Sequence, residues 1–270
     1  MRDHKINILQ GGSGDKSSKA DKPKRKGFGY QILGFGSGGV SICNFITATG
    51  GTVATCGDFK IHTFTGPGTF CVSDGGGDKA IVDYLVIAGG GGGGQGRQGG
   101  GAGAGGFREA KTGSNGCHSA SPIASSTGVQ MEPGAFPITV GSGGAKAIYP
   151  GSGWCYPQKA ENGADSVFST ITSTGGGRGG HGDGGGPQPC TPTADSQSGA
   201  DGGSGGGQAG RDGRSAGSGN TPPVSPSPPQ GNDGGASSGP PSTPCSSNGG
   251  AGGGGAGATG SDAPGSSGDG

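Results

Sequence analysis

Runs of glycine follow ordinary strand-like sequence along this chain, and that order limits what the chain can fold into. Glycine accounts for 74 of the 270 residues. The longest glycine-rich run, residues 89–106, begins directly after the apolar segment 81–88. Glycine loses more backbone freedom on folding than any other residue, and it brings no side chain for chemistry. The glycine blocks are therefore expected either to serve as packing material or to stay disordered.

The composition excludes a conventional hydrophobic core through the whole chain. Hydrophobic residues make up 26% of the sequence, whereas globular domains typically reach about 45–50% on a count that includes glycine. The formal net charge is zero, so nothing draws the chain as a whole to nucleic acid. No apolar stretch approaches the roughly 20 residues that cross a bilayer. We expect no nucleic-acid partner and no membrane insertion.

The N-terminal part differs from the rest in charge. Residues 1–26 are polar and basic, which is typical of a solvated arm or of an arm that docks on an acidic partner. Residues 27–39 form a short apolar island between glycines, of the kind that anchors a terminus. We interpret residues 1–45 as a basic arm and anchoring segment. The candidate attachment residues are Tyr30, Ile32, Leu33 and Phe35.

The cysteines do not predict a metal site. There are seven of them, an odd number, and they are widely spaced with no CxxC pair. This spacing leaves a disulfide framework unproven. Because the N-terminus also lacks the apolar region of a signal peptide, we expect mostly free thiols in a reducing compartment.

Residues 46–88 have the pattern of β-strands. Segments 58–65 and 69–73 flank a Gly-Pro-Gly turn signal and are predicted to pair as a hairpin. Segment 81–88 is predicted as a third strand, apolar enough to be buried on both faces. These segments would form a small antiparallel platform. Sparse further strands are expected within 136–144 and 165–177. No helical periodicity of useful length is present.

Three accounts of the glycine blocks compete. A flexible linker fits the serine and proline content. Collagen needs glycine at every third residue, and the blocks break that period. A bundle of polyproline-II helices would place glycine backbones close enough to hydrogen bond to one another. We favour the bundle because the blocks lie between strands. The predicted fold is mostly β plus irregular, with almost no α-helix, and residues 89–270 form the polyproline-II domain with interspersed strands.

No motif predicts catalysis. GQGRQG at residues 94–99 matches the dinucleotide pattern GxGxxG, but no helical sequence follows, and Glu109 is too near for the expected ribose contact. The four histidines form no close pair, and no GxSxG elbow occurs. We expect no catalytic residue, cofactor or metal, and a protein that is not an enzyme.

Clustered aromatic residues mark a candidate contact loop. They lie in the proline- and glycine-containing segment 148–158, where they are plausible contacts for sugars or for a protein partner. The alternative is a local mini-core at one end of the bundle. Non-glycine residues inside the blocks are expected to point outward or to sit at tips. The candidate contact residues are Tyr149, Trp154, Tyr156, Arg97, Arg178 and His181.

Two motifs resemble a glycine-rich domain that is widespread in phage virion proteins. GDFKIHTFTGPGTFCV is similar to the hairpin of that family, and VDYLVIAGGGGGG is similar to the strand and glycine block that follow it. The resemblance covers roughly residues 47–255. QILGFGSGG, at residues 31–39, looks like the start of small structural proteins of marine and cyanobacterial phages. In related adhesins at the tips of T-even-like tail fibres, such blocks form a sandwich of polyproline-II helices whose loops bind the host surface.

The resemblance implies a virion component, most simply a tail fibre, spike or adhesin assembled in the host cytoplasm. Its partners would be other virion proteins, through the N-terminal segment, and a host cell-surface receptor; a homo-oligomer is expected. A capsid-attached decoration or head-fibre protein is the first alternative. A non-viral ice- or carbohydrate-binding polyproline-II bundle is the second, and an extracellular domain like those of certain receptor kinases is the third.

Overall fold

The computed structural model describes residues 45–77, 80–96, 98–113, 118–148, 159–182, 197–210, 214–224, 229–237 and 249–263. The chain divides into two units, residues 1–43 and 44–270, and every described residue belongs to the second. The predicted attachment residues, from Tyr30 to Phe35, lie outside the described ranges. Within those ranges the regular elements are β-strands in antiparallel sheets, and none is a helix. The expectation of a mostly β chain without α-helix is confirmed for this part.

Among the described residues, no helix has the length and apolar character needed to cross a membrane.

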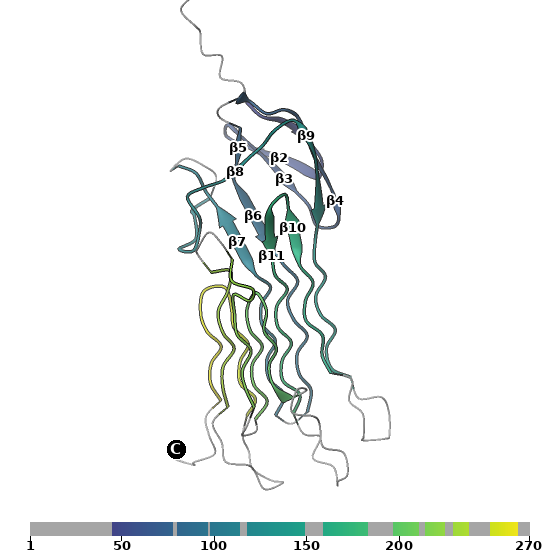
Figure 1. Ribbon diagram of the computed structural model, residues 1–270, viewed down its shortest axis with the longest axis vertical. Helices are drawn as coiled ribbons and strands as arrows, with labels where there is room; N and C mark the ends of the chain where they lie inside the picture. Colours follow the sequence, from purple (N-terminus) through teal and green to yellow (C-terminus); the bar gives the residue numbers. More distant parts are fainter. Residues whose placement is uncertain are drawn as a thin grey trace, which may run out of the picture. The chain divides into compact units, whose positions relative to one another are not determined.

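The largest sheet has five antiparallel strands in the order β1-β4-β9-β10-β11. These strands are β1 (Thr47–Thr49), β4 (Gly68–Asp74), β9 (Gly134–Thr139), β10 (Ser166–Phe168) and β11 (Ile171–Ser173). Three two-stranded sheets accompany it. They pair β2 (Thr52–Cys56) with β3 (Phe59–Thr63), β5 (Ile81–Val82) with β8 (Val129–Gln130), and β6 (Tyr84–Ile87) with β7 (Phe107–Ala110). Figure 1 shows these strands gathered at one end of the unit.

The predicted hairpin between segments 58–65 and 69–73 is wrong. Strand β3 pairs with β2 across a two-residue turn in which Gly57 has a φ of 56°, whereas β4 pairs with β1 and β9. The short β2–β3 turn closes that hairpin locally, and the longer link 64–67 carries the chain to another sheet. The Phe64 ring lies in this link. A Cβ at Gly50, Gly51 or Gly68 would come within 3.0–3.2 Å of that ring.

The hydrophobic core is small and lies between the sheets of the strand region. Phe70 and Val72 of β4 and Met131 form its buried centre. The Phe70 ring packs edge-on against His62 and Phe168, with ring centroids 5.1 and 6.0 Å apart. Side chains therefore form the core only at this end of the unit.

Segment 81–88 is buried on one face only, so the prediction of two buried faces is wrong. Val86 is 8% exposed, but Leu85 and Ile87 on either side of it are 57% and 52% exposed. The hydroxyl of Ser173, on β11, donates to the carbonyl of Val86 at 2.7 Å. Within the described part of the chain, no element covers the opposite face, which carries Leu85 and Ile87.

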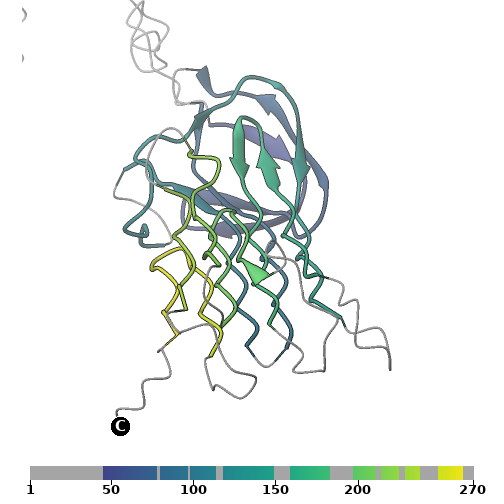
Figure 2. The same cartoon turned by 60° about the horizontal axis from the view of Figure 1, so that its bottom comes forward.

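Several strands continue directly into extended glycine-rich segments, which we call rows. In chain order the rows are R1 (88–96), R2 (98–106), R3 (141–147), R4 (159–165), R5 (174–182), R6 (197–201), R7 (203–210), R8 (214–220), R9 (230–237), R10 (249–256) and R11 (258–263). Figures 1 and 2 both show the rows running alongside one another, away from the strands. Strand β6 leads into R1, and R2 leads back into β7, so the pairing of these strands extends into the rows.

Backbone hydrogen bonds between rows recur at every third residue. From R1, the amides of Ala88, Gly91 and Gly94 donate to the carbonyls of Gly106, Gly103 and Gly100 in R2, each at 3.0 Å. Two amides between these three donate to a different row. Those of Gly89 and Gly92 donate to Ala164 and Glu161 in R4, at 3.0 and 2.8 Å. Each row therefore faces several neighbours in turn, with one residue in three directed to each.

These hydrogen bonds arrange the rows in layers. Successive neighbours in the first layer are R3, R1, R2, R10 and R11; in the second, R4, R5, R7 and R9; in the third, R6 and R8. A row of the second layer bonds to two adjacent rows of the first. R7 is the most enclosed row, because it bonds to R5 and R9 beside it, to R2 and R10 on one side, and to R6 and R8 on the other.

Glycine is sterically required inside this array. A Cβ at Gly94 would lie 1.9 Å from the carbonyl oxygen of Gly180, and one at Gly103 would lie 2.1 Å from that of Ser204. Atoms cannot approach so closely, so an alanine there would push the rows apart. Residues 175–182 of R5 and all of R7 are buried. In this part of the unit the interior consists mainly of backbone, with a few buried polar side chains such as His181 and Gln208.

Candidate functional site at the distal end of the rows

Most of the row-to-row connections lie at one end of the array, remote from the strands, which we call the distal end. Hydrogen bonds hold the row ends together there: the amide of Gly182 donates to the carbonyl of Gln95 at 2.8 Å, and that of Gly210 to Gln98 at 2.9 Å. The amide of Ala147 donates to Gly93 at 3.2 Å. The facing ends of R1 and R2, R3 and R4, R5 and R6, R7 and R8, and R9 and R10 therefore lie at this end (Figure 2).

Four of the predicted contact residues lie outside the described ranges: Arg97, Tyr149, Trp154 and Tyr156. Their described neighbours in the chain are at the distal end. Gly96 and Gln98 flank Arg97, and Ile148 and Lys159 flank the aromatic segment. Ile148 itself is 50% exposed. The assignment of these four residues to a contact surface stays a prediction.

Arg178 and His181 do not point outward, so that prediction is wrong for both. Their side chains are 8% and 1% exposed, and they lie three residues apart in R5, a row of the second layer. The guanidinium Nη1 of Arg178 donates to the carbonyl of Ser198 at 3.0 Å. The sequence shows two non-glycine residues three apart within a glycine block. This spacing predicts that both side chains point the same way, but not whether they point inward or outward.

The layer arrangement explains where the Arg178 side chain fits. Among the described residues, the third layer has no row beside R6 above R4 and R5. A cavity of about 480 Å³ lies at that place. Its lining residues are Lys159, Ala160, Glu161, Asn162, Arg178 and Ala200. Lys159, Glu161 and Arg178 bring both charge signs to the cavity lining, to which R5 contributes Arg178.

At the edges of the array, polar side chains accept hydrogen bonds from backbone amides of the rows. The sequence did not predict these contacts. Asp165 Oδ1 accepts from the amide of Gly175 at 2.8 Å, and Asn162 Oδ1 accepts from that of Arg178 at 2.9 Å. Both acceptors and both donors are three residues apart. Further pairs of the same kind are Asp201 with Ser218, Asp233 with Gly219, Asp262 with Ala236, and Gln208 with Ser237. The signal in the sequence is an Asp or Asn within a glycine block.

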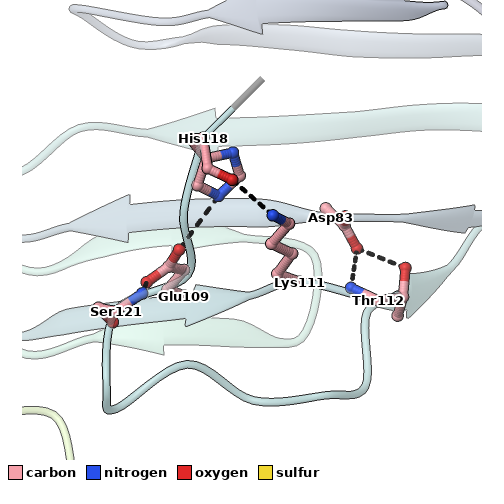
Figure 3. Close-up of polar contacts among 6 residues, drawn as sticks. All are labelled: Asp83, Glu109, Lys111, Thr112, His118 and Ser121. Carbon is pink, nitrogen blue, oxygen red and sulfur yellow. Dashed lines mark hydrogen bonds and ion pairs between the residues drawn. The ribbon is translucent and has the colours of Figure 1, made fainter. Parts of the chain in front are cut away.

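The densest polar cluster lies in the strand region, around Glu109 of β7 (Figure 3). Glu109 is 6% exposed. Its Oε2 accepts from the amide of Ser121 at 3.0 Å, and its Oε1 lies 3.2 Å from His118 Nε2. Burial raises the pKa of Glu109, but hydrogen bonding from Ser121 and the contact with His118 outweigh it. The net effect lowers the pKa below its ordinary value of 4.5.

The neighbouring contacts show what this cluster does. Asp83 Oδ1 accepts from the amide and the hydroxyl of Thr112, at 2.8 and 2.7 Å, and Lys111 Nζ donates to the carbonyl of His118. All these bonds fix the link between β7 and β8 onto the strands (Figure 3). A buried carboxylate with a lowered pKa and occupied oxygens is poorly suited to proton transfer. No group of three His, Cys, Asp or Glu residues that could hold a metal occurs within the described ranges.

The cysteines correct one expectation. Cys56 is disulfide-bonded, which is an exception to the expectation of mostly free thiols, whereas Cys71 is free and exposed. Cys56 and Cys71 are the only cysteines within the described ranges, so the partner of Cys56 lies outside them. Linear spacing could not reveal this pair, because only the folded chain brings the two cysteines together.

Comparisons of this chain with protein-family models, with curated proteins and with solved structures each give no match.

Proposed function

We propose that the rows are polyproline-II helices. A polyproline-II helix has three residues per turn and no hydrogen bonds of its own. The period of three in the row-to-row bonds supports this assignment, as does the fact that the donors of R1 bond to other rows. Glycine would then be required wherever two helices touch, which agrees with the Cβ positions at Gly94 and Gly103.

On this basis we propose a non-catalytic structural component of a phage particle, a tail fibre, spike or adhesin located in the virion. Residues 1–45 would attach it to other virion proteins, and the distal end would contact a host cell-surface receptor. The observation that carries the proposal is the gathering of row connections at the distal end. R3 and R4, which flank the segment containing Trp154 in the sequence, each have one end there.

The physical argument is one of rigidity. An array of rows bonded through their backbones holds its end groups in fixed relative positions without a hydrophobic core, and loops on a rigid scaffold are a common way to build a binding surface. The resemblance of residues 47–94 to the phage glycine-rich domain supports the same role. A capsid-attached decoration or head-fibre protein would use the same parts and differ only in its attachment site.

Two variants test the two halves of the proposal in phage particles assembled in cells that express them. A chain without residues 1–45 is expected to be soluble and folded but missing from purified particles by mass spectrometry. A chain with Tyr149, Trp154 and Tyr156 changed to alanine is expected to enter particles normally and to adsorb to host cells at least tenfold less. Normal incorporation of the first variant would refute the attachment role. Normal adsorption with the second would refute the contact role of the aromatic segment.

A further inference from the structure

On the outer face of the first layer, the side away from the second layer, R1 presents only glycine; exposed side chains on neighbouring rows of this layer include Ala104 on R2 and Lys146 on R3. On R1 the residues directed to this side are Gly90 and Gly93. A Cβ at Gly93 would meet no atom within 4 Å, and one at Gly90 would come no closer than 3.7 Å to its neighbours. Gly143, on the adjacent row R3, is equally open at 3.7 Å. Glycine is therefore not required here by contacts within the chain, unlike at the interior positions.

The same face presents unpaired backbone groups at regular intervals. The amides of Gly90 and Gly93 donate to no described residue, while the other amides from Ala88 to Gly94 all donate to R2 or R4. On R2 the amides of Ala102 and Gly105 are left over in the same way. The free donors recur every three residues, at the spacing that links the rows inside the array.

At another boundary of the array, side-chain oxygens accept hydrogen bonds from the outermost backbone amides. R1 and R2 have no such acceptors on their outer face. Where R5 adjoins the empty place in the third layer, Asn162 and Asp165 supply acceptor oxygens to its amides. Residues 88–94 and 99–106 consist only of glycine and alanine, so R1 and R2 have no side-chain acceptor to offer. An open backbone edge is a template for pairing with another chain unless it is blocked.

We propose that this bare face docks against the same face of a second copy of the chain. The partner must supply extended backbone with hydrogen-bonding groups three residues apart and no long side chain opposite R1, and the part of this face along R1 meets that description. Six to nine residues per row at about 3.1 Å each, across R3, R1, R2, R10 and R11 at about 4.8 Å spacing, give roughly 500–650 Å² a side. The total of roughly 1,000–1,300 Å² is at the lower end for a specific interface.

Sedimentation equilibrium of the full chain tests the proposal over a range of concentrations. The wild type is expected to be a reversible dimer. Gly93→Arg places a long charged side chain on the face without a clash inside the chain, and we expect it to weaken association at least tenfold. Gly66→Arg is the matched control, because a Cβ at Gly66 also meets nothing within 4 Å and this residue lies in the β3–β4 link. It should associate like the wild type. Thermal melts of all three proteins check that the fold is kept.

Hydrogen exchange supplies a second readout. The amides of Gly90, Gly93, Ala102 and Gly105 are expected to exchange more slowly as concentration rises, whereas those of Gly91 and Gly103, already bonded inside the array, should not change. A wild type that stays monomeric, or a Gly93→Arg variant that associates normally, would overturn the proposal. Thermal hysteresis shown by a wild-type monomer and lost in Gly93→Arg would assign the face to ice instead, and would overturn it as well.

Discussion

Asn162 accepts a hydrogen bond from the backbone amide of Arg178, with 2.9 Å between Oδ1 and N. The bond joins R4 to R5 at a place where no further row supplies a carbonyl. Three residues along, Asp165 does the same for Gly175. These side chains replace a missing neighbour, so an array built from backbone can end without leaving its donors unpaired.

The Asn162 bond predicts a specific loss of stability. Asn162→Ala leaves the buried amide of Arg178 without an acceptor, which should cost about 1–3 kcal/mol in the free energy of unfolding. Asn162→Asp keeps an acceptor oxygen and should stay close to the wild type. Urea denaturation of the three proteins gives the comparison. Equal losses in both variants would show that the hydrogen bond is not the cause.

Glycines of the adjacent rows R1 and R2 should respond in opposite ways to alanine. Gly103→Ala puts a Cβ against the carbonyl of Ser204 and should destabilise the chain by about 3 kcal/mol or more, since backbone cannot move aside as a side chain can. Gly93→Ala has open space around it and should stabilise by up to about 1 kcal/mol, because alanine restricts the unfolded chain. Thermal denaturation measures both. Similar destabilisation by the two variants would contradict the backbone-packed interior.

The general character of the fold could be predicted from sequence, but its pairings could not. The strand at 59–63 was located from its alternation, yet its partner is β2 rather than β4, because alternation does not encode which strand lies next to it. The burial of Leu85 was overestimated because an apolar run looks the same whether one or both of its faces are covered.

The candidate site was predictable only in outline. The glycine blocks indicate close backbone packing, but the layer to which each row belongs depends on contacts between distant parts of the chain. Arg178 illustrates the limit. The sequence shows an arginine within a glycine block, but only the folded array shows that its side chain is 8% exposed and donates to the carbonyl of Ser198 on R6. The role of Asn162 was missed for the same reason.

Cysteine accessibility provides a separate test of the strand region. Cys71 is exposed and free, so a maleimide should label it in the native protein. Cys56 should be labelled only after reduction, because it is disulfide-bonded. Peptide mass spectrometry with and without reductant distinguishes the two residues. Labelling of Cys56 in the native, unreduced protein would contradict the disulfide.

The lowered pKa of Glu109 predicts a dependence of stability on pH. Since the carboxylate is favoured in the folded state, its contribution is fully present above the ordinary pKa of 4.5 and is lost as the pH falls through the lower, folded-state pKa. Glu109→Gln removes this contribution. The variant should therefore be less stable than the wild type at pH 7, and the difference should shrink as the pH is lowered below 4.5.

Urea denaturation at pH 7 and at pH 3 measures that difference. Glu132→Gln is a suitable control, because Glu132 is exposed and its replacement should leave the pH profile of the wild type unchanged. His118, which is 55% exposed, contributes through its contact with Glu109. His118→Ala should therefore reduce the pH-dependent part without abolishing it, since the amide of Ser121 still donates to the carboxylate. A difference between wild type and Glu109→Gln that stays constant down to pH 3 would mean that the fold does not favour the charged form.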